Sequence, residues 1–335
     1  MITGWTRRAG LATLTAIGLA ALFAPALSPN PPATEWADRV YAPPMPVHVR
    51  DATGWRAPFV YPQVLEDRIE LRFRDDAEHP TPLIWFAAGH VVSIPADRGP
   101  LLLLGSDRLG RDVFSRLVDG TSRSLGVAVA GTFGALLIGA FVGALAGSRG
   151  GRVERLLMLV ADVIVVLPGA YLVLVLRGLL PIVLEAETVF LLMTALFAVS
   201  AWPHVARGVR AIVAAERTRD YAEAARASGA GPLRVAWHLL PAARGFLAVQ
   251  IVLLVPALLV AEATVSYFGL GFLDPTSSWG TMLQDAANVA LMADTPWLLA
   301  PAVAIFVVVL SLNLLSGARA EHALFAESAP ISSRS

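Results

Sequence analysis

One stretch of this sequence is more informative than any other: Asp220-Tyr221-Ala222-Glu223-Ala224-Ala225-Arg226-Ala227-Ser228-Gly229-Ala230-Gly231-Pro232, continuing to His238-Leu239-Leu240-Pro241. Four positions recur at i, i+3, i+4 and i+7, the spacing of one helix face: Tyr221, Ala224, Ala225 and Ser228. Most of these side chains are small, so another backbone could approach the face closely. Gly229 is suited to end this helix, and Gly231 with Pro232 to begin a second one. The stretch therefore predicts two short helices joined by a sharp turn.

The composition around this stretch is that of a membrane protein. Of the 335 residues, 56% are hydrophobic and only 16% are charged, whereas soluble domains carry about 25% charged residues. The net charge is zero, which leaves no basic footprint for nucleic acid. There is no cysteine, hence no disulfide and no thiolate metal site. All 26 basic residues are arginine, so a Walker A lysine is missing and any ATP must bind to another chain.

Apolar stretches long enough to cross a bilayer recur along the chain. A spanning helix needs about 20 apolar residues, and six stretches meet or approach this length: 9–27, 125–147, 156–176, 189–205, 246–265 and 297–315. We therefore predict an all-α polytopic membrane protein with six transmembrane helices. The first stretch follows Arg7 and Arg8 and ends at Ala24-Pro25-Ala26, so a cleavable secretory signal is the alternative to a signal anchor.

The distribution of arginine predicts the orientation, because short cytoplasmic loops retain basic residues. Arginines gather after the second and the fourth stretch, at 149, 152 and 155 and at seven positions between 207 and 244. The segment between the fifth and sixth stretches has Asp274, Asp285 and Asp294 and no arginine. Both termini are accordingly expected in the cytoplasm.

The expected domain organisation follows from this orientation. Residues 1–28 form the first transmembrane helix, 29–120 a periplasmic segment, 121–316 a transmembrane core of five helices with a cytoplasmic loop at 206–245, and 317–335 a cytoplasmic tail. The periplasmic segment opens with a proline-rich spacer. It then contains two strand-like runs, 68–74 and 82–86, so we expect a small β-containing insertion.

By periodicity alone, the 220–232 stretch is also compatible with a solvated amphipathic connector. It resembles, however, the EAA loop of bacterial ABC-importer permeases, in Glu223, Ala224, Ala225, Gly229 and the later Leu239-Leu240-Pro241. In that family the loop forms a coupling helix that sits in a groove of an ATPase subunit. The resemblance thus implies an ATPase-coupling site at Tyr221, Glu223, Ala224, Ala225, Ser228, Gly229, Leu240 and Pro241.

The resemblance also implies partners and the absence of catalysis in this chain. The partners would be a homologous permease, two ATPase subunits that bind ATP and Mg²⁺, a periplasmic solute-binding protein, and membrane lipid. This chain itself would bind no cofactor. It would form the translocation pathway together with the partner permease.

Further blocks are similar to the dipeptide and oligopeptide importer branch, which includes nickel importers. The block 104–116 resembles a periplasmic motif of that branch in Gly105, Asp107, Gly110, Arg111 and Asp112. Three more matches are Asp162 followed by Pro168, the block 262–271, and Trp279-Gly280. The resemblance covers about 104–315 and thins at 316–320. It implies transport of dipeptides or oligopeptides, with nickel or another peptide-like solute as the alternative.

Individual residues have competing interpretations. Asp162 and Glu262 are acids within apolar stretches, which makes them substrate-path candidates, although both could instead reach the interface or cap a helix. The small residues Gly131, Ala135, Gly139, Gly143 and Gly147 recur at four-residue steps and predict tight helix packing. We expect Arg108, Arg111 and Asp112 to form a structural ion-pair network.

Two other classes of function fit poorly. An intramembrane enzyme would need a metal or nucleophile pattern, and none of the six histidines lies in a His-Glu-x-x-His arrangement. A secondary transporter would have ionisable residues in several spans, whereas Asp162 and Glu262 are nearly the only ones here. A metal site is likewise not expected.

Overall fold

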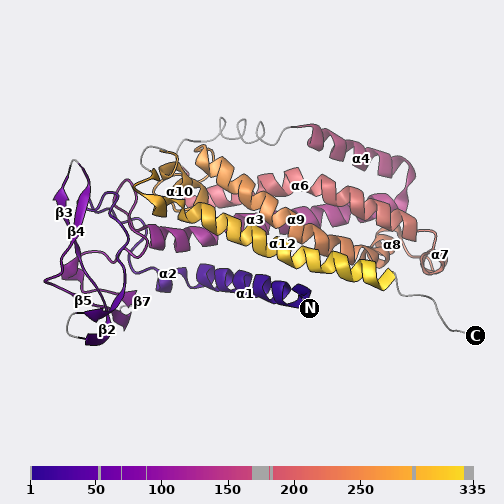
Figure 1. Cartoon of the computed structure of the whole chain (residues 1–335). Helices are drawn as coiled ribbons and strands as arrows, with labels where there is room; N and C mark the ends of the chain where they lie inside the picture. The colour runs from indigo at the N-terminus through magenta and orange to yellow at the C-terminus, as the bar shows by residue number, and fades with distance from the viewer. Residues whose placement is uncertain are drawn as a thin grey trace, which may run out of the picture. The chain divides into compact units, whose positions relative to one another are not determined.

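The computed structural model describes residues 2–51, 54–68, 70–87, 89–167, 181, 184–288 and 292–327 (Figure 1). The chain divides into two compact units, and each is described by itself. Unit 1 comprises residues 1–11, 126–262 and 309–335, and unit 2 comprises residues 12–125 and 263–308. Four long helices run from one unit into the other: α1 (Ile2–Leu22), α3 (Val113–Arg149), α9 (Arg244–Tyr267) and α12 (Ala300–Glu327).

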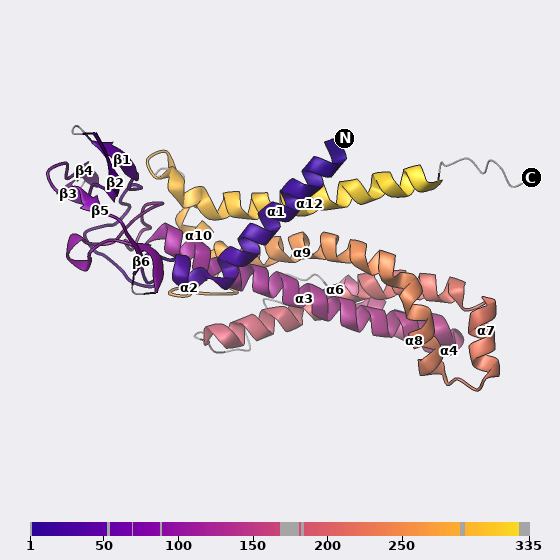
Figure 2. The same cartoon turned by 90° about the horizontal axis from the view of Figure 1, so that it is seen from below.

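All the secondary-structure elements described in unit 1 are helices. Besides its parts of the four long helices it contains α4 (Gly151–Val166), α6 (Ala186–Glu216), α7 (Asp220–Ala227), α8 (Pro232–Leu239) and the 3₁₀ helix η2 (Leu240–Ala243). α7 and α8 lie together at one end of α6 (Figure 1). α1 lies against α12 where Gly10 approaches the carbonyl oxygen of Ser311 (Figure 2). A methyl group at Gly10 would be 2.9 Å from that oxygen.

The predicted stripe of small residues packs α3 against α6. A methyl group at Gly139 would lie 2.5 Å from the Cβ of Val205, and one at Gly143 would lie 2.5 Å from the carbonyl oxygen of Ala206. A methyl group at Gly147 would lie 2.7 Å from the carbonyl oxygen of Arg210. The two backbones approach so closely that only glycine fits. The packing role predicted for the stripe is therefore confirmed.

Unit 2 contains all the strands of the described chain. They are β1 (His48–Asp51), β2 (Gly54–Val60), β3 (Gln63–Asp67), β4 (Arg72–Asp75), β5 (Thr81–Pro82), β6 (Ile84–Ala87) and β7 (His90–Ser93). All pairings are antiparallel: one sheet has the order β1-β2-β5, and two hairpins pair β3 with β4 and β6 with β7. The unit also contains α2 (Ala24–Leu27), α10 (Trp279–Asp285), η1 (Ala96–Arg98) and η3 (Pro296–Leu299).

The segment contains strands, as predicted, but their bounds differ from the predicted runs. Within the run 68–74, β4 begins only at Arg72, after Leu71 takes a left-handed backbone conformation at φ +51°. The run 82–86 is divided between β5 and β6. Val60, Leu101 and Leu102 are fully buried in the core of this part of the unit, with Ala42 and Met45 beside them.

Among the described residues, four helical stretches are long and apolar enough to cross a membrane: Val113–Arg149, Ala186–Glu216, Leu233–Tyr267 and Pro296–Leu315. They contain the predicted spans 125–147, 189–205, 246–265 and 297–315. The first predicted span corresponds to α1 and α2, which are separated at Phe23, and α1 carries Arg7 and Arg8. The third predicted span begins in α4, but 168–176, with Pro168, lies outside the described residues. These two spans remain predictions.

Candidate functional site

The coupling stretch folds into the two short helices that its sequence predicts. α7 begins with the backbone N–H groups of Ala222 and Glu223 donating to the carbonyl oxygen of Arg219, at 2.9 and 3.1 Å. Gly229 follows the helix at φ +78°, a conformation that glycine adopts without steric cost. Gly231 then forms the N-cap of α8 and Pro232 its first residue, where the missing N–H of proline is not needed.

α8 is anchored by apolar packing. Its Val235, Ala236 and Leu239 are buried in a cluster with Val205, Val209 and Val213 of α6 and Ala144 of α3. Of the described side chains of α7, that of Ala222 joins this cluster, and it is 1% exposed. The methyl group of Ala222 therefore packs α7 against this cluster of α6 and α8.

The opposite face of α7 is open in this chain. Tyr221 is 48% exposed, and Glu223, Ala224 and Ser228 are exposed as well. The hydroxyl group of Tyr221 donates to the Glu216 carboxylate at 2.8 Å, and that of Ser228 donates to the carbonyl oxygen of Ala224 at 2.8 Å. The side chain of Ala225 lies outside the described part. Two of the predicted coupling residues follow α8, and of these Leu240 is half-buried and Pro241 is exposed.

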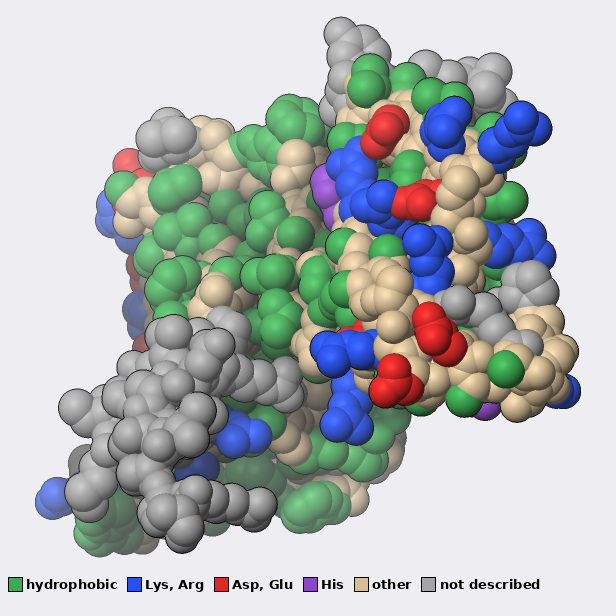
Figure 3. Space-filling model, turned by 90° about the vertical axis from the view of Figure 1, so that its right-hand side faces the viewer, with side chains coloured by type: hydrophobic (Ala, Val, Ile, Leu, Met, Phe, Trp, Pro, Cys, Tyr) green, Lys and Arg blue, Asp and Glu red, His purple; other side chains and the backbone are tan. Residues whose placement is uncertain are grey.

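Charged side chains surround this end of the helical unit. Figure 3 turns that end toward the viewer and shows basic and acidic side chains gathered on it. Two ion pairs join α6 to α4: Arg207 with Asp162 at 2.7 Å, and Arg210 with Glu154. Asp162 is thus an ion-pair partner with a 59% exposed side chain, while Glu262 on α9 is fully buried. Neither observation tests a place on a substrate path, so both remain candidates.

A second constellation lies in unit 2, where the motif 104–116 forms a tight loop. Gly105 and Gly110 both have positive φ, +72° and +78°. A methyl group at Gly105 would lie 2.7 Å from the carbonyl oxygen of Ala42, and one at Gly110 would collide with the carbonyl oxygen of Trp36. The carboxylate of Asp107 holds the loop closed by accepting from the backbone N–H groups of Leu109 and Arg111, each at 2.9 Å.

The arginines of this motif form an ion-pair cluster, most of it buried, which we define by its three basic and three acidic members: Arg108, Arg111, Arg116, Asp107, Asp274 and Asp285. Arg111 contacts Asp107 at 2.7 Å and Asp274 at 2.8 Å. Arg116 contacts the same two carboxylates at 3.5 and 3.1 Å. Arg108 bridges Asp274 and Asp285, at 2.8 and 2.7 Å. The side chains of Arg111 and Arg116 are 1% and 0% exposed.

The surroundings set the proton affinities in this cluster. Burial raises the pKa of Asp285 to about 6, and the nearby Asp107 charge adds to the shift. For Asp274, burial acts in the same direction, but hydrogen bonds and charge from Arg111 and Arg116 hold its pKa below the usual range. The cluster contains three arginines and three aspartates, so its formal charges cancel.

Asp112 does not belong to the ion-pair cluster, and the prediction that it would is wrong. Its carboxylate accepts from the hydroxyl group of Ser115 at 2.5 Å and from the side-chain amide of Asn30 at 2.9 Å. These partners are neutral. Because burial outweighs these hydrogen bonds, the pKa of Asp112 is raised to about 6. Arg108 and Arg111 do take part in ion pairs, as predicted.

The raised pKa values of Asp112 and Asp285 predict a pH dependence of stability. A carboxyl group whose pKa is higher in the folded than in the unfolded state stabilises the fold below pH about 4 and loses this contribution as pH rises through about 6. We expect the thermal midpoint of the purified protein to fall between pH 5 and pH 7.5. In Asp112→Asn the fall should be smaller, since one titrating group is gone. An equal fall in wild type and variant would contradict the assignment to Asp112.

Comparison with known proteins identifies the class. Residues 136–321 match the family model described as the binding-protein-dependent transport system inner membrane component. The match spans more than half of the chain, and the chain belongs to this family. It is accordingly a multi-pass membrane protein and the permease subunit of an ABC importer of the peptide and nickel type. Permease subunits of this family are not themselves catalytic.

Individual relatives refine this picture. The nickel transport system permease protein NikC of Escherichia coli (strain K12) is 36% identical over 220 residues, covering 65% of this chain and 77% of that protein. The oligopeptide transport system permease protein OppC of Bacillus subtilis (strain 168) is 36% identical over 194 residues, 58% of this chain and 61% of OppC. The dipeptide transport system permease protein DppC of the same organism is 36% identical over 212 residues, 63% of this chain and 64% of DppC.

Proposed function

We propose that α7 is the coupling helix through which an ATPase subunit drives this permease. The observation that carries the proposal is the division of α7 into two faces. Ala222 is buried against α6 and α8, whereas Tyr221, Glu223, Ala224 and Ser228 face away from the chain. A helix of eight residues is marginal in water by itself, so a partner on its exposed face would stabilise it. Small side chains let that partner approach closely, and the carboxylate of Glu223 can accept hydrogen bonds across the interface with the ATPase subunit.

The complete importer would contain a homologous partner permease, two ATPase subunits that bind ATP and Mg²⁺, and a periplasmic solute-binding protein. The family name supports dependence on a binding protein. The chain itself would bind no cofactor and no nucleic acid. It would share the translocation pathway with the partner permease, with Asp162 and Glu262 as the residues to test along it.

In the proposed topology the chain has six spans in the bacterial inner membrane, with both termini in the cytoplasm. Four spans would be the candidate helices in α3, α6, α9 and α12, and the others would be 9–27 and 156–176. The strands of unit 2 and the ion-pair cluster would then lie in the periplasmic segment and its neighbouring loops, and α7 in the cytoplasmic loop 206–245. The tail 317–335 would be cytoplasmic.

This topology predicts opposite labelling of two engineered cysteines. The natural chain has no cysteine. A single cysteine introduced at Glu78, in the β-containing insertion, or at Ser228 is therefore labelled without background from other cysteines of this chain. Both residues are exposed. A membrane-impermeant maleimide added to intact cells, with the outer membrane permeabilised, should label Glu78→Cys and spare Ser228→Cys. In cells that lack the ATPase subunits, permeabilising both membranes should expose Ser228→Cys, which is the positive control. Labelling of Ser228→Cys in intact cells would overturn the orientation.

For the solute, we propose dipeptides or oligopeptides, supported by the similarity to OppC and DppC. The similarity to NikC favours nickel as the second candidate. Uptake of a labelled dipeptide, a labelled tetrapeptide and ⁶³Ni²⁺ should be compared in cells with and without this chain. We expect deletion to lower peptide uptake and to leave nickel uptake unchanged. Loss of nickel uptake alone would reverse the assignment.

A further inference from the structure

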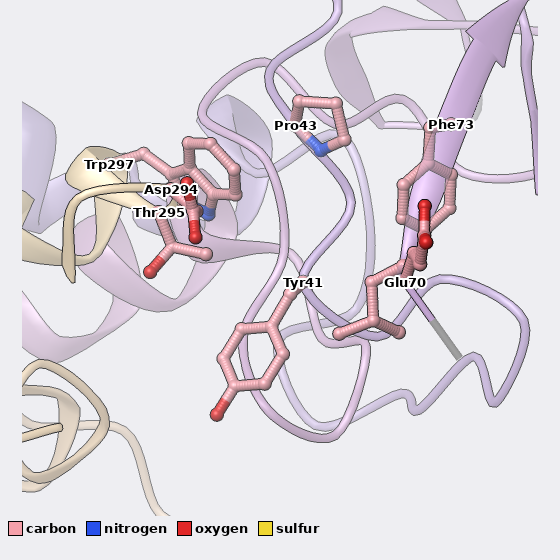
Figure 4. A pocket seen from close by; sticks show the side chains of 8 residues that line it. Tyr41, Pro43, Glu70, Phe73, Asp294, Thr295 and Trp297 are labelled. Carbon is pink, nitrogen blue, oxygen red and sulfur yellow. The ribbon is translucent and has the colours of Figure 1, made fainter. Parts of the chain in front are cut away.

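A cavity of about 220 Å³ in unit 2 is distinct from both the coupling stretch and the ion-pair cluster. Three of the residues that line it are aromatic, Tyr41, Phe73 and Trp297, and two are acidic, Glu70 and Asp294. Figure 4 shows Asp294 beside Trp297 on one side of the cavity and Glu70 beside Phe73 on the other, with Tyr41 between the two sides. Pro43, Leu71 and Thr295 complete the lining.

The charge of this lining is negative. No arginine or histidine is among the lining residues. Glu70 pairs with Arg72 at 2.5 Å, but both side chains are more than half exposed, so solvent screens this pair. In the described part of the chain, no ion pair is formed by Asp294. The cavity thus combines aromatic faces with a carboxylate available for a cation.

The aromatic walls are held in place before any ligand arrives. The indole N–H of Trp297 donates to the carbonyl oxygen of Ser106 at 2.9 Å, and the backbone N–H of Tyr41 donates to that of Asp107 at 3.1 Å. Trp297 and Tyr41 also pack against the buried cluster of Val113, Met282, Ala286 and Leu298. A rigid wall loses little freedom when a ligand binds, which favours affinity.

Backbone strain points to the same cavity. In the described chain, three residues other than glycine have positive φ, and two of them line it: Tyr41 at +52° and Leu71 at +51°. Such conformations are uncommon for residues with a side chain, and they gather where a binding geometry is maintained. The strain thus falls on the two segments that present Tyr41 and the Glu70 side of the cavity.

We propose that this cavity binds an organic cation, a guanidinium or alkylammonium group, between its aromatic rings and carboxylates. Aromatic faces attract such cations, most strongly where water is excluded, and a guanidinium also stacks on a ring. The volume suits one side-chain-sized group and not a folded domain. The cation could belong to a free solute or to an arginine side chain on a polypeptide, and these two sources share the same chemistry.

The test is calorimetric titration of the purified protein with two Nα-acetylated ligands, arginine amide and citrulline amide, of which the second carries a neutral ureido group in place of the guanidinium. We expect arginine amide to bind about tenfold more tightly, a difference worth 1.4 kcal/mol. Asp294→Asn should weaken its binding about fivefold or more, and Glu70→Gln less, since Glu70 already has a partner. Asp97→Asn is the matched control, because Asp97 is 77% exposed and outside the cavity; it should bind like wild type.

A second titration, with the capped peptide acetyl-Gly-Arg-Gly-amide, distinguishes the two sources. Binding as tight as that of arginine amide would indicate a polypeptide-borne side chain, and much weaker binding would indicate a free solute. Both results require the cation site. Equal affinity for arginine amide and citrulline amide, or unchanged binding in Asp294→Asn, would overturn the proposal. Asp294→Asn and Glu70→Gln alter exposed side chains, so a folding defect is not expected to obscure the result.

Discussion

ATP-dependent solute uptake should fall at least about tenfold when Ala224 is replaced by tryptophan or Glu223 by arginine. Ala224 is exposed in this chain, so the tryptophan creates no clash within the permease. Against a close-fitting partner it would cost about 1–3 kcal/mol through overpacking, and about 1.4 kcal/mol corresponds to a factor of ten in affinity. Glu223→Arg reverses the charge that α7 presents to the ATPase subunit. The measurement is uptake in cells that carry the whole importer.

Ala215→Trp provides the matched control for this prediction. Ala215 is exposed near the end of α6, outside the predicted coupling residues, so the same substitution should leave uptake close to the wild-type level. Membrane levels of each variant must be equal, as determined by immunoblotting, so that loss of uptake is separated from loss of insertion. Wild-type uptake in both Ala224→Trp and Glu223→Arg would show that α7 is a solvated connector.

The largest effect on stability is expected from removing Asp274. Its carboxylate is the common partner of Arg108, Arg111 and Arg116, and the latter two are fully buried. Asp274→Ala would leave these charges undercompensated. Removing one partner of a buried ion pair costs about 3–5 kcal/mol, and we expect the lower end because the side chain of Asp274 is 31% exposed.

This prediction is measured as the thermal midpoint and the yield of the purified protein in detergent. Asp97→Ala is the control, because Asp97 is 77% exposed and its pair with Arg98, which is 44% exposed, is a surface pair, for which a change within about 1 kcal/mol is expected. A thermal midpoint for Asp274→Ala equal to that of wild type would mean that the cluster does not stabilise this fold.

Local signals predicted the local structure of the coupling stretch well. Gly229, Gly231 and Pro232 place the end of α7 and the start of α8 because each acts on the backbone of its own neighbours. The glycine stripe of α3 likewise predicted its packing, since the four-residue period places these residues on one face. The exposure of Ala224 and Ser228 agrees with the predicted face, but no local signal indicated that Ala222 would be the buried anchor.

Long-range partners could not be predicted. Asp274 follows Arg111 by more than 150 residues, and nothing in the sequence around Asp274 or Asp285 marks them as the carboxylates that Arg108 and Arg116 meet. Similarly, Asp112 is adjacent to Arg111 in the sequence, yet it turns toward Asn30 and Ser115. The start of β4 was misplaced because the φ of Leu71 is positive, which the alternating pattern of 68–74 does not reveal.

Contact between α7 and an ATPase subunit is the central claim, and site-directed cross-linking tests it most directly. A single cysteine at Ser228, carrying a photoactivatable maleimide, should form a cross-link to an ATPase subunit in membranes that contain the assembled importer. A cysteine at Arg152, which is exposed at the start of α4, serves as the control and should give little product. Strong cross-linking from position 228 that exceeds the control is the predicted result. No ATPase adduct from position 228 in an importer that still transports would contradict the account.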